Sequence, residues 1–238
     1  MRPQILILRP QPGADRTARR ARMLGLEPLV TPIFTVRPLA WEAPDRSRYE
    51  AVLLTSANAA RHGGLQLASF HHLPCYAVGE ATAAAARSAG FADVRAGSSD
   101  GSDLARRMAQ EGLSKVLHLH GREHIAPAGG PMTIEGRAVY AADAATRLAG
   151  ETIEALRGGA VALIHSPRAG ATFGRLAEAA ALGRAGILLA AISEAAAAAA
   201  GPGWKACPSA PVPSDHALLE LAAKLCKDGV FGATETGG

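Results

Sequence analysis

Aromatic residues and charge of one sign are both scarce in this sequence. Aromatic side chains make up 4% of the 238 residues, which argues against a platform on which nucleic-acid bases would stack. The net charge of +4 arises from interspersed charges of both signs and falls far short of a nucleic-acid-binding surface. This mild excess of positive charge suits a small anionic ligand, so we expect no nucleic-acid partner.

Cysteines and long apolar runs are also few. Cys75, Cys207 and Cys226 are odd in number and lack metal-type spacing, which indicates free thiols in a reducing cytoplasm. The apolar run in MRPQILILRP is too short for a signal peptide, and no other run approaches the length of a membrane span. We therefore expect a cytoplasmic protein without a membrane partner.

The chain does contain a low-resolution internal repeat. Three segments of its first half return in its second half at a nearly constant offset, which predicts two similar α/β units with a ligand-binding cleft between them. The pairs are AVLLTSANAA (51–60) with VALIHSPRA (161–169), CYAVGEATAAAARSAGF (75–91) with LLAAISEAAAAAAGPGW (188–204), and GSDLARRMA (101–109) with PSDHALLELAA (213–223).

A fourth segment shows how the chain is divided. KVLHLHGRE (115–123) has its counterpart at the N-terminus, in QILILRPQPG (4–13), so the first strand is expected to complete the C-terminal unit. We predict one discontinuous domain, 1–35 plus 144–238, and one inserted domain, 38–137. The linkers are expected near 35–38 and 137–144, as two connecting strands.

Apolar runs alternate with helical segments along the chain, which predicts doubly wound parallel sheets in both domains. The expected strands are Ile5–Leu8, Ala51–Thr55, Cys75–Val78, Val116–His120, Val161–His165 and Leu188–Ile192. The expected helices are Ala14–Leu24, Ala57–Leu67, Glu80–Ala89, Asp103–Glu111, Ala169–Ala181, Glu194–Ala200 and Asp215–Lys227, with Ser102 and Ser214 as N-caps. The Gly-rich end after Cys226 is expected to fray.

Ligands of such sheets bind at the carboxyl ends of the strands, near helix N-termini that favour anions. The chain places hydroxyls, glycines and two arginines there, and it has no acidic pair, nucleophile elbow, P-loop or GxGxxG motif. The pattern indicates a site that holds a polyanion; for the serines, plain helix capping is the alternative. The candidate binding residues are Arg9, Thr55, Ser56, Gly79, Thr82, Gly121, Arg122, Ser166 and Ser193.

Histidines cluster in VLHLHGREH, where His118 and His120 share one face of the expected strand. An HxH pair is able to bind a metal, but no third ligand with suitable spacing is evident. We therefore expect no metal, and interpret His118, His120 and His124 as surface or core histidines, with His120 or His124 pairing with a ligand carboxylate as the alternative.

Several of these segments, in this order and spacing, resemble the uroporphyrinogen-III synthase family over nearly the whole chain. They are LILRPQPGADRTARRARMLGLEPLVTPIFTV, AVLLTSANAA, CYAVGEATAAAARSAGF, SDGSDLA, RAVYAADA and ALIHSPRAGATF. The resemblance implies two α/β domains joined by a two-stranded linker, one of them discontinuous. It implies a cyclising lyase of haem and tetrapyrrole biosynthesis that takes linear hydroxymethylbilane, removes water, inverts ring D and yields uroporphyrinogen III.

The resemblance also implies roles for particular residues. Tyr140, in AVYAADA, matches the linker tyrosine of the family and would donate a proton to the leaving water; a structural tyrosine is the alternative. Thr82 matches a threonine near substrate carboxylates. No cofactor is implied, and we expect a monomer, with the upstream bilane-forming enzyme as a candidate partner.

The chain departs from the family in two places. Ala195 and Ala196 stand where the family commonly carries a threonine, and Asn58 stands where some members carry arginine. These changes leave open a non-catalytic regulatory or ligand-binding module on the same scaffold. A carrier similar to a periplasmic binding protein is disfavoured by the missing signal sequence.

Overall fold

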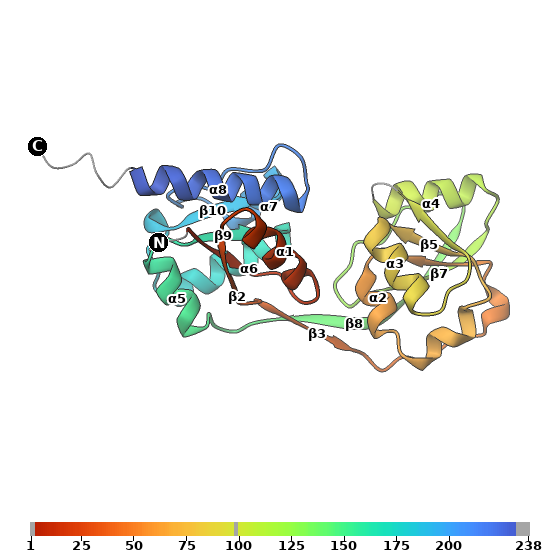
Figure 1. Cartoon of the computed structure of the whole chain (residues 1–238). Coiled ribbons are helices and arrows are strands. Elements are labelled where there is room, and N and C mark those ends of the chain that lie inside the picture. Colours follow the sequence, from red (N-terminus) through yellow and green to blue (C-terminus); the bar gives the residue numbers. More distant parts are fainter. Residues whose placement is uncertain (1–2, 98–99, 232–238) are drawn as a thin grey trace, which may run out of the picture. The chain divides into compact units, whose positions relative to one another are not determined.

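The computed structural model describes residues 3–97 and 100–231, and it shows an α/β protein built from parallel sheets (Figure 1). The chain divides into two compact units. Unit 1 comprises residues 1–35 and 144–238, and unit 2 comprises residues 36–143. The prediction of an α/β fold with parallel sheets is confirmed. None of the described helices is long and apolar enough to cross a membrane.

Unit 1 contains a four-stranded sheet of order β10-β9-β1-β2 in which all three strand pairs are parallel. Strands β9 and β10 are buried along their whole length, because helices cover both faces of the sheet. The strands are β1 (Gln4–Ile7), β2 (Glu27–Val30), β9 (Val161–Ile164) and β10 (Leu188–Ala191). The helices are α1 (Gly13–Met23), α5 (Gly150–Arg157), α6 (Pro167–Ala179), α7 (Glu194–Ala200), α8 (Asp215–Phe231) and a 3-10 turn at Arg184–Gly186.

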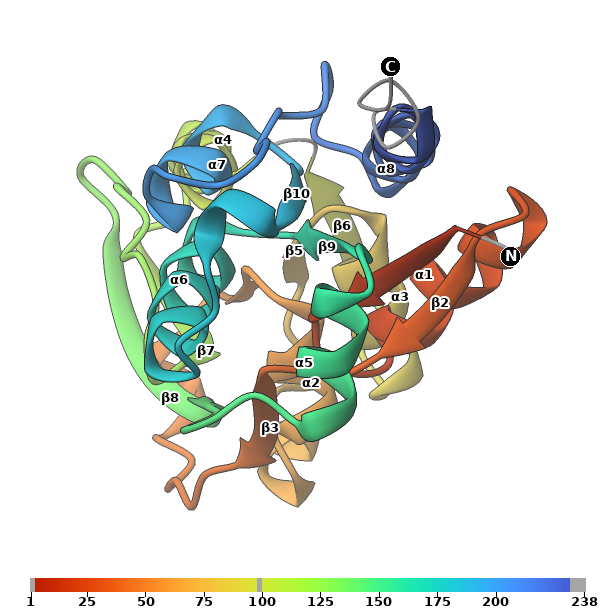
Figure 2. The same cartoon turned by 90° about the vertical axis from the view of Figure 1, so that its left-hand side faces the viewer.

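Each face of this sheet has its own set of helices. Helices α1 and α8 pack together on one face, over a core that includes Ile5, Leu163 and Leu218. Helices α5, α6 and α7 contact the sheet on its other side (Figure 2). Helices α6 and α7 pack very closely: a Cβ built on Gly170 of α6 would lie 2.5 Å from the carbonyl oxygen of Ala196.

Unit 2 is built on a six-stranded sheet of order β3-β8-β7-β4-β5-β6. The boundaries between the two units fall within its strands β3 and β8, which are neighbours in the sheet. The strands are β3 (Phe34–Pro38), β4 (Ala51–Leu54), β5 (Cys75–Val78), β6 (Val94–Gly97), β7 (Lys115–Gly121) and β8 (Thr133–Ala144). The helices are α2 (Ala57–His62), α3 (Glu80–Ser88) and α4 (Gly101–Gln110), with 3-10 turns at Arg46–Arg48 and Leu65–Phe70.

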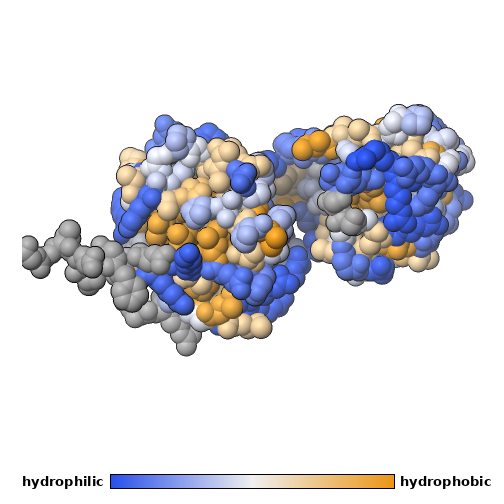
Figure 3. All heavy atoms as spheres, turned by 90° about the horizontal axis from the view of Figure 1, so that it is seen from above, coloured by the Kyte–Doolittle hydropathy of each residue, from blue (hydrophilic) through white to orange (hydrophobic). Residues whose placement is uncertain are grey.

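The two faces of this second sheet also have separate cores. Leu117 and Leu119 of β7 join the cluster formed with α2 and α3, whereas Val116 joins the cluster formed with α4. Side chains alternate along a strand, so His118 and His120 lie on the α4 face. Apolar and hydrophilic residues are interspersed on the face of each unit seen in Figure 3.

The internal repeat is visible in the strand order. The series β10-β9-β1-β2 of unit 1 matches the series β5-β4-β7-β8 of unit 2, and each echoed strand therefore has the echoed neighbours. The registers agree as well, since Ile5 pairs with Val161 and Val116 pairs with Ala51. The units differ after the central strand: helix α1 comes next after β1, while residues 122–132, which contain no helix or strand, come next after β7.

Several expected helix ends were wrong. The helix expected over Ala57–Leu67 ends at His62, because Gly64 adopts a positive φ of 71° and a 3-10 turn follows. Ser102 is not the N-cap of α4: Asp100 caps that helix by accepting from the Ser102 and Asp103 N–H groups. Helix α8 continues past Lys227 to Phe231, while the rest of the expected C-terminal tail lies outside the described residues.

Candidate functional site

Two predicted binding residues of unit 1 cap helices at the carboxyl edge of its sheet. The Ser166 hydroxyl accepts from the N–H of Ala169 at 3.1 Å at the start of α6, and the Ser193 hydroxyl accepts from the N–H of Ala196 at 3.3 Å at the start of α7. Strands β9 and β10 are parallel neighbours, so both caps lie at the same edge. This geometry fits helix capping, and it leaves ligand binding by these serines a prediction.

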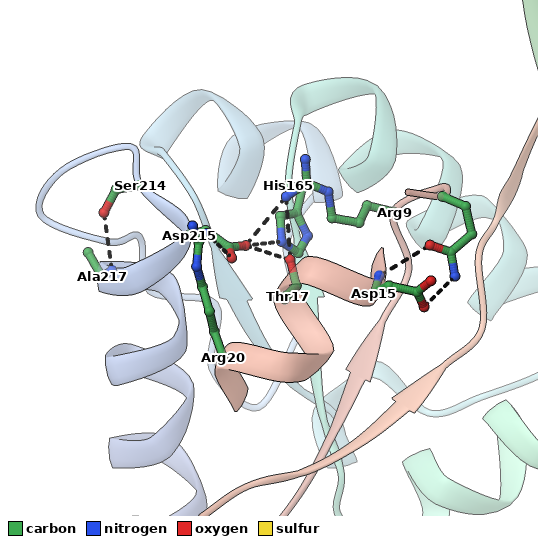
Figure 4. Close-up of polar contacts among 9 residues, drawn as sticks. Arg9, Asp15, Thr17, Arg20, His165, Ser214, Asp215 and Ala217 are labelled. Atoms are coloured by element: carbon green, nitrogen blue, oxygen red, sulfur yellow. Dashed lines mark hydrogen bonds and ion pairs between the residues drawn. The ribbon is translucent and has the colours of Figure 1, made fainter. Parts of the chain in front are cut away.

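Arg9, the third predicted residue of unit 1, belongs to a polar cluster that links β1, α1, β9 and α8 (Figure 4). Its centre is Asp215, the first residue of α8. One carboxylate oxygen of Asp215 accepts from the Thr17 hydroxyl at 2.7 Å and lies 3.2 Å from His165 Nε2 and 3.4 Å from Arg9 Nη1. The other oxygen accepts from Arg20 at 2.9 Å. We call Arg9, Thr17, Arg20, His165 and Asp215 the Asp215 cluster.

The charges of this cluster follow from its contacts. Burial opposes ionisation of Asp215, but hydrogen bonds from His165, Thr17 and Arg20 outweigh it and hold the pKa of that carboxyl well below its usual range. Burial lowers the pKa of His165 despite the hydrogen bond to Asp215, so the ring is neutral at pH 7. The guanidinium of Arg9 is therefore already paired with a carboxylate within unit 1.

The first predicted group of unit 2 lies at the ends of β4 and β5. Ser56 caps α2 by accepting from the N–H of Asn58 at 3.2 Å. Thr55 Oγ1 lies 3.0 Å from Nε2 of His118 on the neighbouring strand. Gly79 caps α3 with a positive φ of 73°, and the Thr82 side chain in the first turn is buried. Strands β4 and β5 are parallel neighbours, so these residues share one edge of the sheet.

The second group of unit 2 lies where β7 and β8 diverge. The register shifts there, so that Gly121 pairs with Tyr140, and the N–H of Arg122 donates to the Tyr140 carbonyl at 2.8 Å. The Tyr140 ring covers Gly121, since a Cβ on that glycine would lie 2.7 Å from Tyr140 Cζ. The ring also lies 6.4 Å from that of His62, while Arg122 pairs with Asp143 at 3.5 Å. Tyr140 is thus partly buried and positioned within unit 2.

The three histidines after β7 form one cluster, which the sequence did not indicate. One ring nitrogen of each of His118, His120 and His124 lies within 4.8 Å of the others. The expectation that no third histidine accompanies the HxH pair was wrong, because residues 122–132 bring His124 back against the strand. Burial, together with the neighbouring rings, lowers the pKa of His118 to about 3, and burial also lowers that of His120.

Within each unit, the predicted residues therefore gather at the carboxyl edge of the sheet, as the fold requires. Sequence reasoning missed Thr17, His165 and Asp215; the Asp directly after Ser214 in PSDHALLE was the available signal. A surface hollow of about 670 Å³ elsewhere on unit 2 is lined by Trp41, Arg48, Arg137 and their neighbours, and includes none of the predicted residues.

Comparison with known proteins gives a family match. The family described as uroporphyrinogen-III synthase HemD matches residues 15–220 of the chain. No curated protein matches the sequence significantly.

Solved structures of the family were compared with the chain as well. The uroporphyrinogen-III synthetase of Helicobacter pylori 26695 shows the same fold, with a TM-score of 0.62 at 18% identity, covering 94% of this chain and 100% of that one. A mutant uroporphyrinogen III synthase of Thermus thermophilus gives a TM-score of 0.48 at 14% identity, covering 95% of this chain and 99% of that one.

Proposed function

The chain belongs to the uroporphyrinogen-III synthase family, and from that premise we propose how its own residues carry out the reaction. Enzymes of this family are cyclising lyases that convert hydroxymethylbilane into uroporphyrinogen III. The match over residues 15–220 carries this conclusion, because it includes both repeated strand series and the tyrosine of β8.

The chemistry needs control of geometry more than a reactive side chain. An electron-rich pyrrole expels its terminal hydroxyl as water once a proton reaches the leaving oxygen, giving an azafulvene cation. The substituted carbon of ring D attacks, and the spiro intermediate opens and recloses with that ring inverted. The proton lost on reclosure balances the one given to water. The protein holds the chain so that this closure competes with the simple one.

We assign the proton donation to Tyr140. Its ring is held over Gly121 and near His62, so the phenol has a defined position on β8. A phenol donates a proton at neutral pH because its ordinary pKa is about 10. Arg122 follows Gly121 and has a half-exposed side chain, which lets it reach a substrate carboxylate.

The remaining carboxylates of the substrate are assigned to hydroxyl groups and backbone N–H groups at the strand ends. In unit 2 these belong to Thr55, Ser56, Gly79 and Thr82, and in unit 1 to Ser166 and Ser193. Helix N-termini carry a partial positive charge, which favours carboxylates. Arg9 takes part only by exchanging its contact with Asp215 for one with the substrate.

The test of the activity is an isomer assay. Hydroxymethylbilane is generated in situ, the protein is added, and the oxidised porphyrins are resolved into type I and type III. We expect type III product in excess of the protein-free control. Type I alone, as in that control, would instead support a non-catalytic binding module, for which Ala195 and Ala196 are the motivating observation.

The test of Tyr140 uses two variants. Tyr140→Phe removes only the hydroxyl, and we expect kcat to fall by about 10² while thermal stability is kept. Gly121→Ala keeps the hydroxyl but places a methyl group where the ring now lies, so it should also lower kcat by displacing the phenol. An unchanged rate in Tyr140→Phe would remove this residue from the chemistry.

The cellular setting rests on less specific observations. We propose a cytoplasmic monomer that receives its unstable substrate from the upstream bilane-forming enzyme. The three free cysteines agree with a reducing compartment. Chemical cross-linking of the two purified enzymes, with and without substrate turnover, tests the partnership.

A further inference from the structure

The histidine cluster of unit 2 occupies the place that a helix takes in unit 1. Helix α1 follows β1 and packs beside α8, whereas residues 122–132 follow the equivalent strand β7, on the sheet face covered by α4. In these residues the chain turns back, so that exposed His124 stacks on buried His120 with ring centroids 3.5 Å apart. The ring of His118 lies 4.9 Å from that of His120 and 5.7 Å from that of His124.

The hydrogen bonds of the two buried rings leave nitrogen lone pairs for a ligand. Nδ1 of His120 lies 2.8 Å from the carbonyl oxygen of Gly121, which only accepts, so Nδ1 carries the proton and Nε2 has a lone pair. A backbone carbonyl that fixes the tautomer in this way is the usual support of a metal-binding histidine. In His118, Thr55 engages Nε2 at 3.0 Å, which leaves Nδ1 for another partner.

The space beside Nε2 of His120 is kept open by a glycine. A Cβ built on Gly136 of β8 would lie 2.7 Å from this nitrogen, so any other residue there would occupy the ligand position. His118 and Gly136 are register partners on the adjacent strands β7 and β8, so both buried rings are held by the sheet. Only His124, on the exposed segment, has to move for the three nitrogens to converge.

We propose that His118, His120 and His124 form a binding site for a divalent transition-metal ion of the Zn²⁺ class, independent of the cyclisation chemistry. A tetrahedral ion with Zn–N bonds of about 2.0–2.1 Å needs ligand nitrogens roughly 3.4 Å apart. The present separations, all within 4.8 Å, approach that value, and a shift of His124 supplies the rest. Three imidazoles suit Zn²⁺, Ni²⁺ or Cu²⁺ rather than Mg²⁺ or Ca²⁺, and the fourth position stays open to water or a carboxylate.

The experiment measures binding of the metal alone. Tag-free protein competes with a chromogenic chelator for Zn²⁺, and bound Co²⁺ is followed by its visible absorption. We expect one ion per chain. His124→Ala removes an exposed ligand without touching the core, and should weaken Zn²⁺ binding more than about tenfold. His216→Ala is the matched control, since His216 is an exposed histidine of α8 that contacts Glu220 and should keep wild-type affinity.

A second variant tests the geometry while keeping all three histidines. Gly136→Ala places a methyl group against His120 Nε2 and should also weaken Zn²⁺ binding. Wild-type binding no tighter than that of His124→Ala, or equal losses in His216→Ala, would overturn the proposal. Unaltered affinity in Gly136→Ala would overturn the assignment of His120 Nε2 as a ligand. Circular-dichroism melting curves establish that each variant is folded.

Discussion

Replacing Asp215 by alanine should destabilise unit 1 and leave unit 2 unchanged. The Asp215 side chain is 11% exposed, and it accepts hydrogen bonds from elements that are distant in sequence. Its removal leaves His165 and Thr17 without their partner inside the protein. It also removes the carboxylate that neutralises Arg9, whose side chain is one-third exposed.

The magnitude follows from these contacts. A hydrogen bond to a charged group contributes about 1.5–3 kcal/mol, and the buried bonds from Thr17 and His165 dominate the loss. The pair with Arg20, whose side chain is 56% exposed, adds at most about 1 kcal/mol. Allowing for relaxation and water entry, we expect the free energy of unfolding of unit 1 to fall by about 3 kcal/mol. Arg20→Ala, as the graded control, should cost less than about 1 kcal/mol.

The two tryptophans allow the units to be measured separately. Trp204 belongs to unit 1, where it stacks on Phe173, and Trp41 belongs to unit 2, where it stacks on Phe70. Urea unfolding is followed by fluorescence in a Trp41→Phe background, which reports unit 1, and in a Trp204→Phe background, which reports unit 2. An Asp215→Ala shift below about 0.5 kcal/mol in the Trp204 signal, or equal shifts in both signals, would refute the reasoning.

Three further expectations concern packing, pH and thiol reactivity. Gly170→Ala should destabilise unit 1 by about 1–3 kcal/mol, because its Cβ would meet backbone atoms of α7, whereas Gly150→Ala, with nothing within 4 Å, should be neutral; equal urea midpoints would contradict this. The stability of unit 1 should fall as the pH drops below about 6.5, where unfolded but not folded His165 binds a proton, and further below about 4, as Asp215 protonates more readily when unfolded; a flat profile from pH 7.5 to 3.5 would count against both. Burial raises the pKa of Cys75 to about 12 and of Cys226 to about 11, so both should react slowly with a disulfide reagent at pH 8 and fast after unfolding, with half-exposed Cys207 reacting first in the native protein.

The parts of the fold that the sequence predicted are those with the strongest apolar pattern. Runs such as AVLL and VALI end within a residue or two of the observed strands, because a strand buried on both faces leaves no room for polar residues. Strand β6 was missed, since its sequence VRAG lies at the edge and is largely exposed. Helix α5, GETIEALR, was missed as well.

The candidate site was predictable by position and less so by contact. Strand-end residues were found because parallel sheets gather their carboxyl ends at one edge. Pairings between distant residues were not, because His165 and Asp215 are 50 residues apart and no spacing rule joins them. His124 was overlooked for a similar reason: ligand spacing along the chain says nothing about a segment that folds back on its strand.

The central position of β1 has a consequence for synthesis on the ribosome. This strand lies between β2 and β9, so the first segment to emerge has to wait for one of its sheet partners until β9 is translated. Residues 36–143 are contiguous, and all strands that flank β4 and β7 lie among them. The nascent chain should therefore acquire protease resistance first in its middle third, while the early apolar strand remains a client for chaperones.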